Sequence, residues 1–290
     1  MEFIETLLNG LSAGGTYAMI ALGYTMVYGI AKMLNFAHGD VIMVGGYTLF
    51  ITMGMMGNPI LALILAVVCC TVLGVTIEKV AYKPLRGASP LAVLITAIGM
   101  SYLLQSLAQI IFGSANKSVD LMELGNISLG ALQLSTYTVI TLVASGVIMA
   151  ALSLFVKYTR TGRAMIAVSE DRDAAQLMGI NVNRIITLTF AIGSGLAAFA
   201  GFFMTLKTYN VSTTMGAMPG IKAFTAAVIG GIGSIPGAMV GGLLMGVVEA
   251  FSQTSPAIAP YTDAIEFAIL IVILLVRPSG ILGKKRREKV

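Results

Sequence analysis

The residues that could do chemistry in this chain are few, and their spacing argues against catalysis. The only histidine is His38, so a metal site with two histidine ligands is excluded. Residues 10–14 (GLSAG) match the letters of a Gly-x-Ser-x-Gly motif, but they lie in an apolar stretch and not at a strand-to-helix turn. The sequence has no Gly-x-x-x-x-Gly-Lys-Ser/Thr loop for nucleotide phosphates. We therefore expect no enzyme and no bound cofactor or metal, and an ATP-driven step would use ATP bound to another chain.

A group of polar residues lies at the entrance to the apolar segment 38–57. Asn35 and His38 precede or begin it, and Asp40 follows two residues later. Charge inside a membrane is costly and tends to mark function, so these residues are candidates for a transport pathway. A local role is the alternative, because Asp40 near a helix N-terminus would interact favourably with the helix dipole. The ionisable residues that flank the segment 252–261 are expected at the water boundary: Glu249, Asp263 and Glu266.

The composition identifies a membrane protein. Of the 290 residues, 57% are hydrophobic and 11% are charged, whereas a soluble domain has about 25% charged residues. This excludes a soluble globular enzyme, and the high hydrophobicity also excludes intrinsic disorder. The net charge of +5 is attributed to a cytoplasmic membrane face and not to nucleic-acid binding. The adjacent Cys69 and Cys70 lie in an apolar run and suggest neither a disulfide framework nor a metal site.

Apolar segments of the length needed to cross a bilayer recur along the chain. About 20 apolar residues are needed for one crossing. The region 219–251 is also apolar, but glycines and Pro236 interrupt it, so it could be one irregular span or two short helices at about 221–233 and 237–251. The segments expected to form full spans are 6–29, 38–57, 59–78, 91–112, 135–156, 185–206 and 262–276.

The distribution of charge favours two short helices over one. With the loops 79–90 and 157–184 inside, the N-terminus lies outside, and the basic tail 277–290 is also expected inside. This placement requires an even number of crossings after residue 184. Of the 18 Lys and Arg residues, only Lys117, Lys207 and Lys222 are then outside, a bias typical of positive-inside sorting. We expect a single all-α polytopic domain over 1–290, with about nine membrane helices.

Glycine is expected to set the packing of this bundle. The 33 glycines recur at small-xxx-small spacing, as in Gly10/Gly14 and Gly242/Gly246, which lets helix backbones approach closely. Broken helices at 221–251 must be sheltered from lipid, and transporters often place such helices near their pathways. A kinked helix with a purely structural role is the alternative. Together with the polar entrance, the pathway candidates are Asn35, His38, Asp40, Gly45, Gly46, Gly230, Gly231 and Gly233.

The large inner loop, 157–184, differs from the rest because it carries charges of both signs. Ser169 is suited to be an N-cap and Gly179 to follow the helix end, so we predict a short surface helix over about 170–178. Such a helix could fit a groove on a cytoplasmic partner, or it could pack on its own bundle. The apolar residues that would form the contact, at i, i+3 and i+4 spacing, are Ala174, Leu177 and Met178.

Four segments, in order and over nearly the whole chain, resemble the permeases of branched-chain amino acid ABC importers, and most closely the shorter of their two types. They are GGTYAMIALGYTMVYGIAKMLNFAHGDVIMVGGY (14–47), GRAMIAVSEDRDAAQLMGI (162–180), AVIGGIGSIPGAMVGG (227–242) and VRPSGILG (276–283). The resemblance implies a multi-pass subunit of the bacterial cytoplasmic (inner) membrane, surrounded by lipid, that works by alternating access. Its implied partners are a second permease, two ATPase subunits that hold ATP and Mg, and a periplasmic binding protein that delivers leucine, isoleucine or valine.

The same resemblance implies a role for the inner loop. In ABC importers a cytoplasmic loop with an Ala-x-x-x-Gly core docks in a groove of the ATPase, and Ala175 and Gly179 match that spacing. The Glu-Ala-Ala form of the family is replaced here by Asp173-Ala174-Ala175. The implied ATPase-coupling residues are Arg163, Asp171, Asp173, Ala174, Ala175, Leu177 and Gly179.

Two other classes of transport protein compete with this interpretation. An ion-coupled secondary transporter would need its own ion site, for which His38, Asp40 and Glu249 are the candidates. A passive channel for a small polar solute would also use short glycine-rich helices, but it would leave the inner loop unexplained. The substrate rests on the resemblance alone, since related permeases carry other amino acids, amides or urea.

Overall fold

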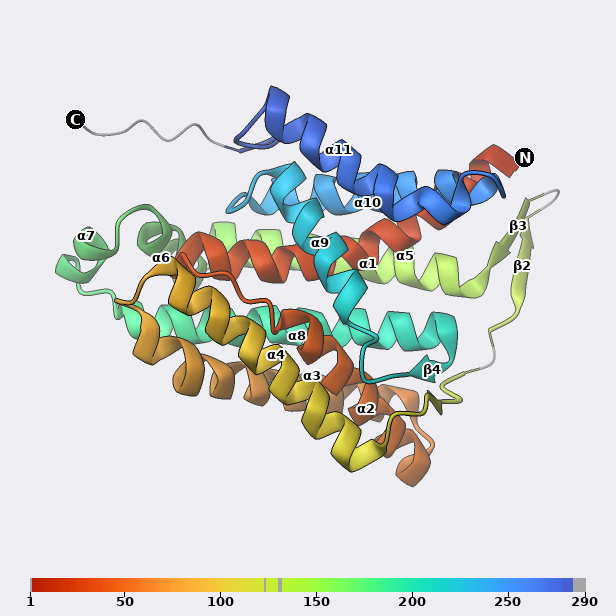
Figure 1. Ribbon diagram of the computed structural model, residues 1–290, viewed down its shortest axis with the longest axis horizontal. Helices are drawn as coiled ribbons and strands as arrows, with labels where there is room; N and C mark the ends of the chain where they lie inside the picture. The colour runs from red at the N-terminus through yellow and green to blue at the C-terminus, as the bar shows by residue number, and fades with distance from the viewer. Residues whose placement is uncertain (1, 123, 130–131, 284–290) are drawn as a thin grey trace.

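The computed structural model describes residues 2–122, 124–129 and 132–283 of the chain as a bundle of long helices (Figure 1). The predicted basic tail, 277–290, lies outside the described residues from 284 onward. Two short antiparallel pairs of strands join loops at one end of the bundle: β1 (Lys117–Ser118) with β4 (Asn210–Val211), and β2 (Asn126–Leu129) with β3 (Leu132–Ser135). The helices of the bundle are α1 (Glu2–Ala31), α2 (His38–Met56), α3 (Pro59–Ile77), α4 (Pro90–Phe112), α5 (Thr136–Tyr158), α8 (Val182–Thr208), α9 (Ala217–Gly230), α10 (Ile235–Thr254) and α11 (Thr262–Val276).

Within the described ranges, seven helices are long and apolar enough to cross a membrane: α2, α3, α4, α5, α8, α10 and α11. This confirms a polytopic all-α architecture. The expectation of a short helix at 237–251 is wrong, because α10 has 20 residues, whereas α9 has 14. The predicted first span, 6–29, corresponds to the 30-residue α1, which is not among the seven.

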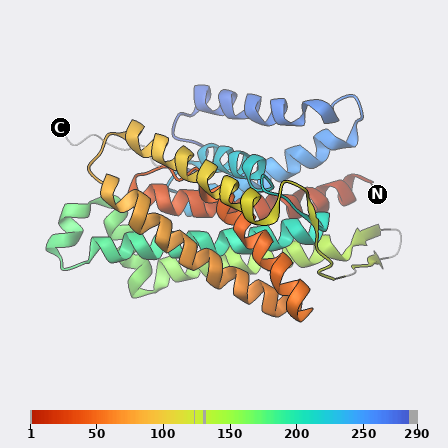
Figure 2. The ribbon, with the colours of Figure 1, turned by 60° about the horizontal axis from the view of Figure 1, so that its bottom comes forward.

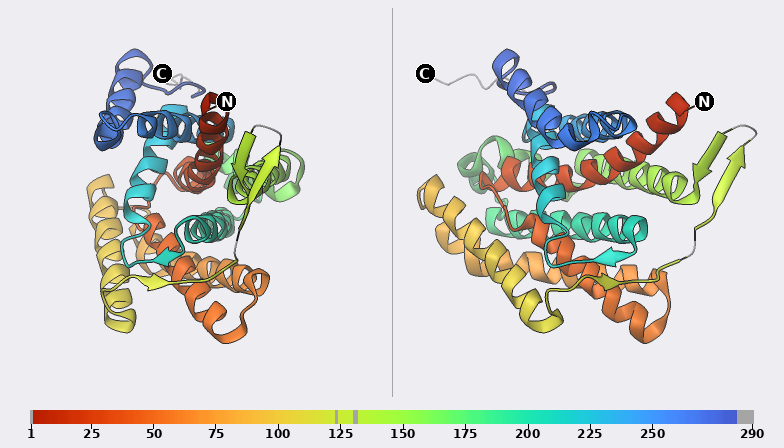
Figure 3. Two further views of the ribbon diagram at one scale, coloured as in Figure 1. Left: turned by 90° about the vertical axis from the view of Figure 1, so that its right-hand side faces the viewer. Right: turned by 45° about the vertical axis from the view of Figure 1, so that its right-hand side comes forward.

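The central position of α1 explains its less apolar composition. It contacts α5, α8, α9 and α10, and almost every residue from Gly14 to Ala31 is buried by them. A helix enclosed by protein does not need the apolar side chains that a lipid-facing helix needs. The view along the bundle shows α1 and α8 at its centre, with α9 crossing from the α10–α11 side toward α2 (Figure 3).

Glycine contacts hold α1 against α10, as the small-xxx-small spacing predicts. A Cβ atom added to Gly14 would lie 2.7 Å from Leu243 Cα, and one added to Gly10 would lie 2.9 Å from Val247 Cα. These separations are too short for a side chain, so the two backbones are in direct van der Waals contact. Gly246 faces Gly14 in the same interface.

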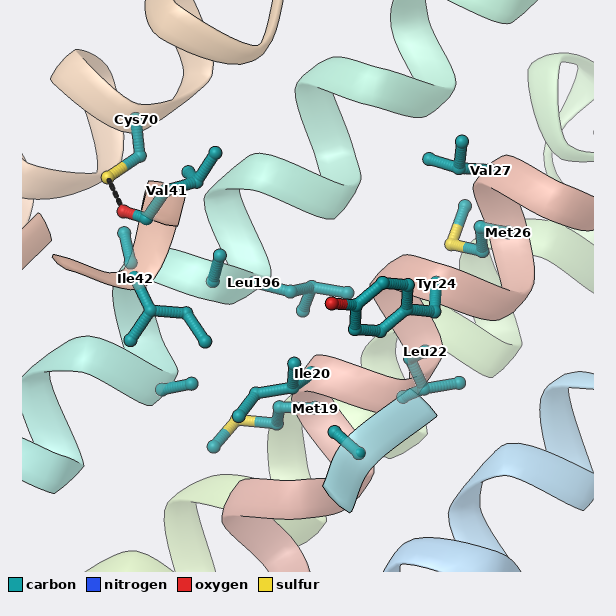
Figure 4. Close-up of a cluster of buried hydrophobic side chains, with 14 of the residues drawn as sticks. Met19, Ile20, Leu22, Tyr24, Met26, Val27, Val41, Ile42, Cys70 and Leu196 are labelled. Atoms are coloured by element: carbon teal, nitrogen blue, oxygen red, sulfur yellow. Dashed lines mark hydrogen bonds between the residues drawn. The ribbon is translucent and has the colours of Figure 1, made fainter. Parts of the chain in front are cut away.

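The apolar core lies where α1, α2, α3 and α8 meet (Figure 4). Met19 and Ile20 of α1 pack near Ile42 of α2, and all three have no exposed surface. Cys70 of α3 is a buried free thiol whose Sγ donates to the Val41 carbonyl at 3.4 Å. The thiol therefore serves as a small core residue.

The outward faces of the bundle are apolar as well. Exposed large hydrophobic side chains gather on α3, α4, α5 and α11, and α4 and α11 lie along its outside (Figure 2). Apolar surfaces of this kind would cause aggregation in water, but they are suited to contact with lipid.

The packing of α1 on α10 predicts that one glycine substitution destabilises the fold and that a second leaves its stability unchanged. Gly14→Val should destabilise the fold by about 1–3 kcal/mol, because the new side chain overlaps the α10 backbone. Gly146→Val is the matched control, since nothing lies within 4 Å of a Cβ added there. Thermal unfolding and the monodisperse fraction in detergent measure the difference. Equal loss in both variants would contradict the assignment of this interface.

Candidate functional site

The inner loop folds into two helices, α6 (Arg160–Glu170) and α7 (Arg172–Leu177), at the end of the bundle opposite the N-terminus (Figure 1). The Thr159 hydroxyl caps α6 by accepting from Gly162 N–H at 2.9 Å. One face of α6 is held by the bundle, because Met165 is 1% exposed and Val168 has no exposed surface. Arg163 lies on the exposed side of the same helix. The loop is therefore a rigid, two-helix element.

The start of the surface helix was predicted two residues too early. Ser169 does not cap it, because this residue lies inside α6 and its hydroxyl donates to the Ile166 carbonyl at 2.7 Å. The chain becomes extended at Asp171 (φ −151°, ψ 113°), whose carboxylate accepts from Ala174 N–H at 3.0 Å. An Asp side chain is at least as good an N-cap as Ser, which explains why the chain leaves the α6 helix and starts α7 at Asp171.

The end of α7 confirms the predicted role of Gly179. Its φ of +81° is left-handed, which an L side chain rarely adopts. Its N–H donates to the Gln176 carbonyl at 3.0 Å, and Ile180 N–H donates to the Ala175 carbonyl at 3.0 Å. These two bonds form a Schellman motif, which ends the helix sharply and fixes its shape.

The tip of α7 presents large apolar side chains to the surroundings. Leu177 is 88% exposed and Met178 is 82% exposed, whereas Ala175 is 4% exposed and faces the bundle. The structure thus brings together on one short, exposed element most of the sequence-predicted coupling residues: Asp171, Asp173, Ala174, Leu177 and Gly179.

The sequence analysis missed Arg172, which ties this element to the centre of the bundle. Its Nη2 donates to the carbonyl of Ile30, in the last turn of α1, at 2.9 Å. Burial and the neighbouring Arg86 lower the pKa of the Arg172 guanidinium from its usual range. This bond joins the start of α7 to the last turn of α1.

The polar entrance residues are placed deeper than expected. After α1 ends, residues 32–37 run back along the bundle, and α2 begins with His38 packed against Gly23 of α1. Asn35 and Asp40 are each 3% exposed and His38 is 1% exposed, so all three lie inside the bundle. The sequence alone does not predict that residues 32–37 run back along α1. A linker of six residues could equally continue away from the bundle.

Hydrogen bonds hold two of these residues to neighbouring helices. Tyr82 donates from its hydroxyl to Asn35 Oδ1 at 2.9 Å, and Gln105 Nε2 donates to Asp40 Oδ1 at 2.8 Å. The His38 ring lies edge-on to the ring of Tyr24, with 4.8 Å between their centroids. This polar group therefore joins α1, α2 and α4 inside the bundle.

Glycines allow α2 and α9 to begin against each other. A Cβ added to Gly39 would lie 3.7 Å from Gly220 Cα, and Gly39 also faces Gly216. The predicted pathway residues Gly45 and Gly46 lie further along α2 in packed interfaces, Gly45 against Cys70 and Gly46 against Met215. Both act as packing positions in this structure.

The break between α9 and α10 is a turn stabilised by left-handed glycines and a side-chain cap. Gly231 and Gly233 have φ of +108° and +92°, and the Ser234 hydroxyl caps α10 by accepting from Gly237 N–H at 3.2 Å. The segment after α11 folds back onto the break. Ile281 N–H donates to the Ile229 carbonyl at 2.8 Å, and Leu282 N–H donates to the Gly230 carbonyl at 2.9 Å. These bonds satisfy carbonyls that a helix end leaves without partners.

A cavity of about 320 Å³ lies beside this break. It is formed by the last turns of α1, by the end of α9 and by the segment after α11. The predicted pathway residue Gly233 is part of its wall, while Gly230 and Gly231 are packed against Gly237 and Gly283. The residues around the cavity are Tyr28, Gly29, Lys32, Val228, Ile232, Gly233, Pro278, Ser279 and Gly283.

Two buried ionic groups were not foreseen. Glu78 has no exposed surface, forms an ion pair with Arg86 and accepts from the Thr187 hydroxyl at 2.8 Å. Lys222 lies among three carboxylates that were expected at the water boundary, so that expectation was wrong for the fully buried Glu266. The signal for the second group was present in the sequence, since Lys222 is a charged residue within an apolar helix.

Comparison with known proteins gives full-length relatives. Residues 6–274 match the family model described as a branched-chain amino acid transport system permease component. The chain is 44% identical to the high-affinity branched-chain amino acid transport system permease protein BraD of Pseudomonas aeruginosa and 43% identical to LivH of Escherichia coli K12, with 100% of this chain and 98% of each relative covered. Among solved structures, PsaBC from Streptococcus pneumoniae in complex with Fab covers 95% of this chain and 90% of its own, with 19% identity and a TM-score of 0.46.

The capping of α7 gives a prediction for hydrogen exchange. Asp171→Ala should cost about 1 kcal/mol locally and speed exchange of the α7 amides about fivefold, because Ala174 N–H loses its acceptor. Ser169→Ala is the matched control and should leave α7 unchanged. Mass spectrometry of deuterium uptake in peptides covering 172–178 measures both. A larger effect from Ser169→Ala would restore the sequence-based cap.

Proposed function

This chain belongs to the family of branched-chain amino acid transport system permease components, and from that premise we propose how it works. It is a transport subunit and not an enzyme. Together with a second, different permease it forms the pathway for leucine, isoleucine or valine, which a periplasmic binding protein delivers. Two ATPase subunits bind its inner face and hold ATP and Mg, so this chain needs no cofactor of its own. Identity of 44% over the whole chain to a permease named for that transport carries the proposal.

The tip of α7 is the surface that meets an ATPase subunit. Leu177 and Met178 are the apolar centre of the contact, and Asp171 and Asp173 form its charged rim, with Arg163 on the adjoining α6. A rigid helix with an exposed apolar tip is suited to a groove on a partner. The Ala175 methyl faces the bundle, so the Ala-x-x-x-Gly spacing acts here by shaping the helix end at Gly179.

The pathway opens to alternate sides as the ATPases close and separate. When ATP binding moves α7, the bond from Arg172 to Ile30 passes the movement to α1. The elements proposed to change the pathway are the start of α2, with Asn35, His38 and Asp40, and the break at Gly230, Gly231 and Gly233. ATP shifts this equilibrium only if the ATPases bind one arrangement of the docked loops better than the other.

The proposed topology has the N-terminus outside and the C-terminus inside a bacterial inner membrane, with α9 and α10 both entering the membrane and about nine membrane helices in total. Because irregular backbone cannot face lipid, α9 and its break must be enclosed by protein or border a wet cavity. The 320 Å³ cavity at the break supports this arrangement.

Substitutions in α7 test the docking role. Leu177→Asp should lower ATP-driven uptake about tenfold or more, because it places a charge in the apolar centre of the contact. Gly179→Pro should also lower ATP-driven uptake, since proline cannot adopt a φ of +81°. Reversal of the charges at Arg163 and Asp171 should lower it as well. Met122→Asp is the matched control, an equally drastic change at a 43% exposed residue outside α7.

The measurement is uptake and ATPase activity of the complete transporter, with co-purification of the ATPase subunits. The variants should stay in the membrane while the ATPases dissociate or become uncoupled. Normal uptake by all three α7 variants would remove the docking role. Uptake that survives ATP depletion but stops with an uncoupler would favour an ion-coupled carrier.

The topology is tested by a reporter fused after Val290. A reporter that is active only in the cytoplasm should give signal there, and one that is active only outside should be silent. The reverse result would overturn the inside placement of the C-terminus and the even number of crossings after residue 184.

A further inference from the structure

A buried ionic cluster joins the last three helices of the bundle. Lys222 of α9 lies 2.8 Å from Asp263 and 3.2 Å from Glu266, both on α11, and 3.6 Å from Glu249 on α10. The Lys222 side chain is 9% exposed, that of Glu266 has no exposed surface, and that of Asp263 is 51% exposed. Tyr17 of α1 also faces the cluster beside Glu249. The cluster therefore extends from the surface into the interior.

The charges of this cluster do not balance. In the described part of the chain, Lys222 is the one cation paired with the three carboxylates. Glu266 is wholly buried, and its Oε2 pairs with Lys222 Nζ at 3.2 Å, while its Oε1 forms no hydrogen bond within the described residues. A buried ion pair adds little stability over apolar packing, and here one lysine faces three carboxylates, of which only Glu266 is fully buried. Lys222 therefore has three carboxylates within 3.6 Å, and it could pair with any of them.

The position of Lys222 on α9 gives this choice of partner a mechanical effect. The inner end of α9 is fixed by backbone bonds from Ile281 and Leu282. Its other end begins after Gly216 without a side-chain cap and packs on α2 through glycine. Lys222 is therefore the ionic link between the outer half of this short helix and the α10–α11 pair, and a change of partner would tilt the helix about its fixed inner end.

We propose that Lys222 is a positioning residue for transport, which exchanges between the exposed Asp263 and the less exposed Glu249 and Glu266 as the pathway opens and closes on the outer side. This inference rests on the proposed function. The exchange gives α9 two discrete positions, because each partner lies on a different turn or helix. Asp263 holds the helix toward the surface, and Glu249 with Glu266 holds it toward the interior.

The first test uses the complete transporter in proteoliposomes. Lys222→Met should lower uptake about tenfold or more, since removing one partner leaves uncompensated buried charge, while ATP hydrolysis without the binding protein persists. Lys222→Arg should retain uptake, and the exchange Lys222→Glu with Glu266→Lys should recover it in part. Lys207→Met is the matched control, an exposed lysine at the end of α8. Unchanged uptake in Lys222→Met overturns the proposal, as does joint loss of assembly and hydrolysis that neither Lys222→Arg nor the exchange restores.

The second test measures the position of α9 directly. Met218→Cys, at a 43% exposed residue in the first turn of α9, is labelled with a membrane-impermeant maleimide after the exposed Cys69 is replaced by Ser. The buried Cys70 is left in place. Asp263→Asn and Glu266→Gln should change the labelling rate in opposite directions, because they remove opposite partners. Changes in the same direction, or none, overturn the exchange.

These readouts separate the inference from the proposed function. If the unsubstituted transporter hydrolyses ATP but does not take up branched-chain amino acids, the substrate assignment fails. The labelling rates and the ratio of stimulated to basal hydrolysis still report on Lys222.

Discussion

The structure depends on one constraint, which is that every backbone polar group within a bilayer must find a partner inside the protein. This chain interrupts regular helix inside its own bundle at residues 32–37 and again at residues 231–234. Each interruption is sheltered. In the first, the Phe36 ring packs on Phe224 of α9, and the Tyr82 hydroxyl donates to Asn35. The second receives two backbone bonds from the segment after α11.

Glycine makes this shelter possible. A carbonyl or amide in an interruption can be reached only if the neighbouring backbone comes close, and contacts such as Gly14 with Leu243 and Gly39 with Gly216 leave no room for side chains. The same close approach surrounds α1 with α5, α8, α9 and α10. As a result, α1 connects α7, through the bond from Arg172 to Ile30, with the buried start of α2.

Much of this architecture could be predicted from the sequence, because it follows from local patterns. Apolar length located the spans, glycine spacing located helix faces that pack closely, and Gly179 located the end of α7. Prediction failed where the outcome depends on tertiary contacts. The N-cap of α7 is Asp171 and not Ser169, the helix expected at 237–251 has 20 residues, and Glu266, expected at the water boundary, is buried. The partners of Lys222 are 27 or more positions away in the sequence, so no local pattern could pair them.

The central claim is that this chain supplies a membrane pathway whose energy comes from separate ATPases bound to its inner face. The most direct measurement compares uptake of radiolabelled leucine into liposomes that contain this chain alone with uptake into liposomes that contain it with its second permease, its ATPases, its binding protein and ATP. Accumulation against a gradient is predicted only in the complete, ATP-supplied system. Uphill accumulation by the chain alone would contradict the account.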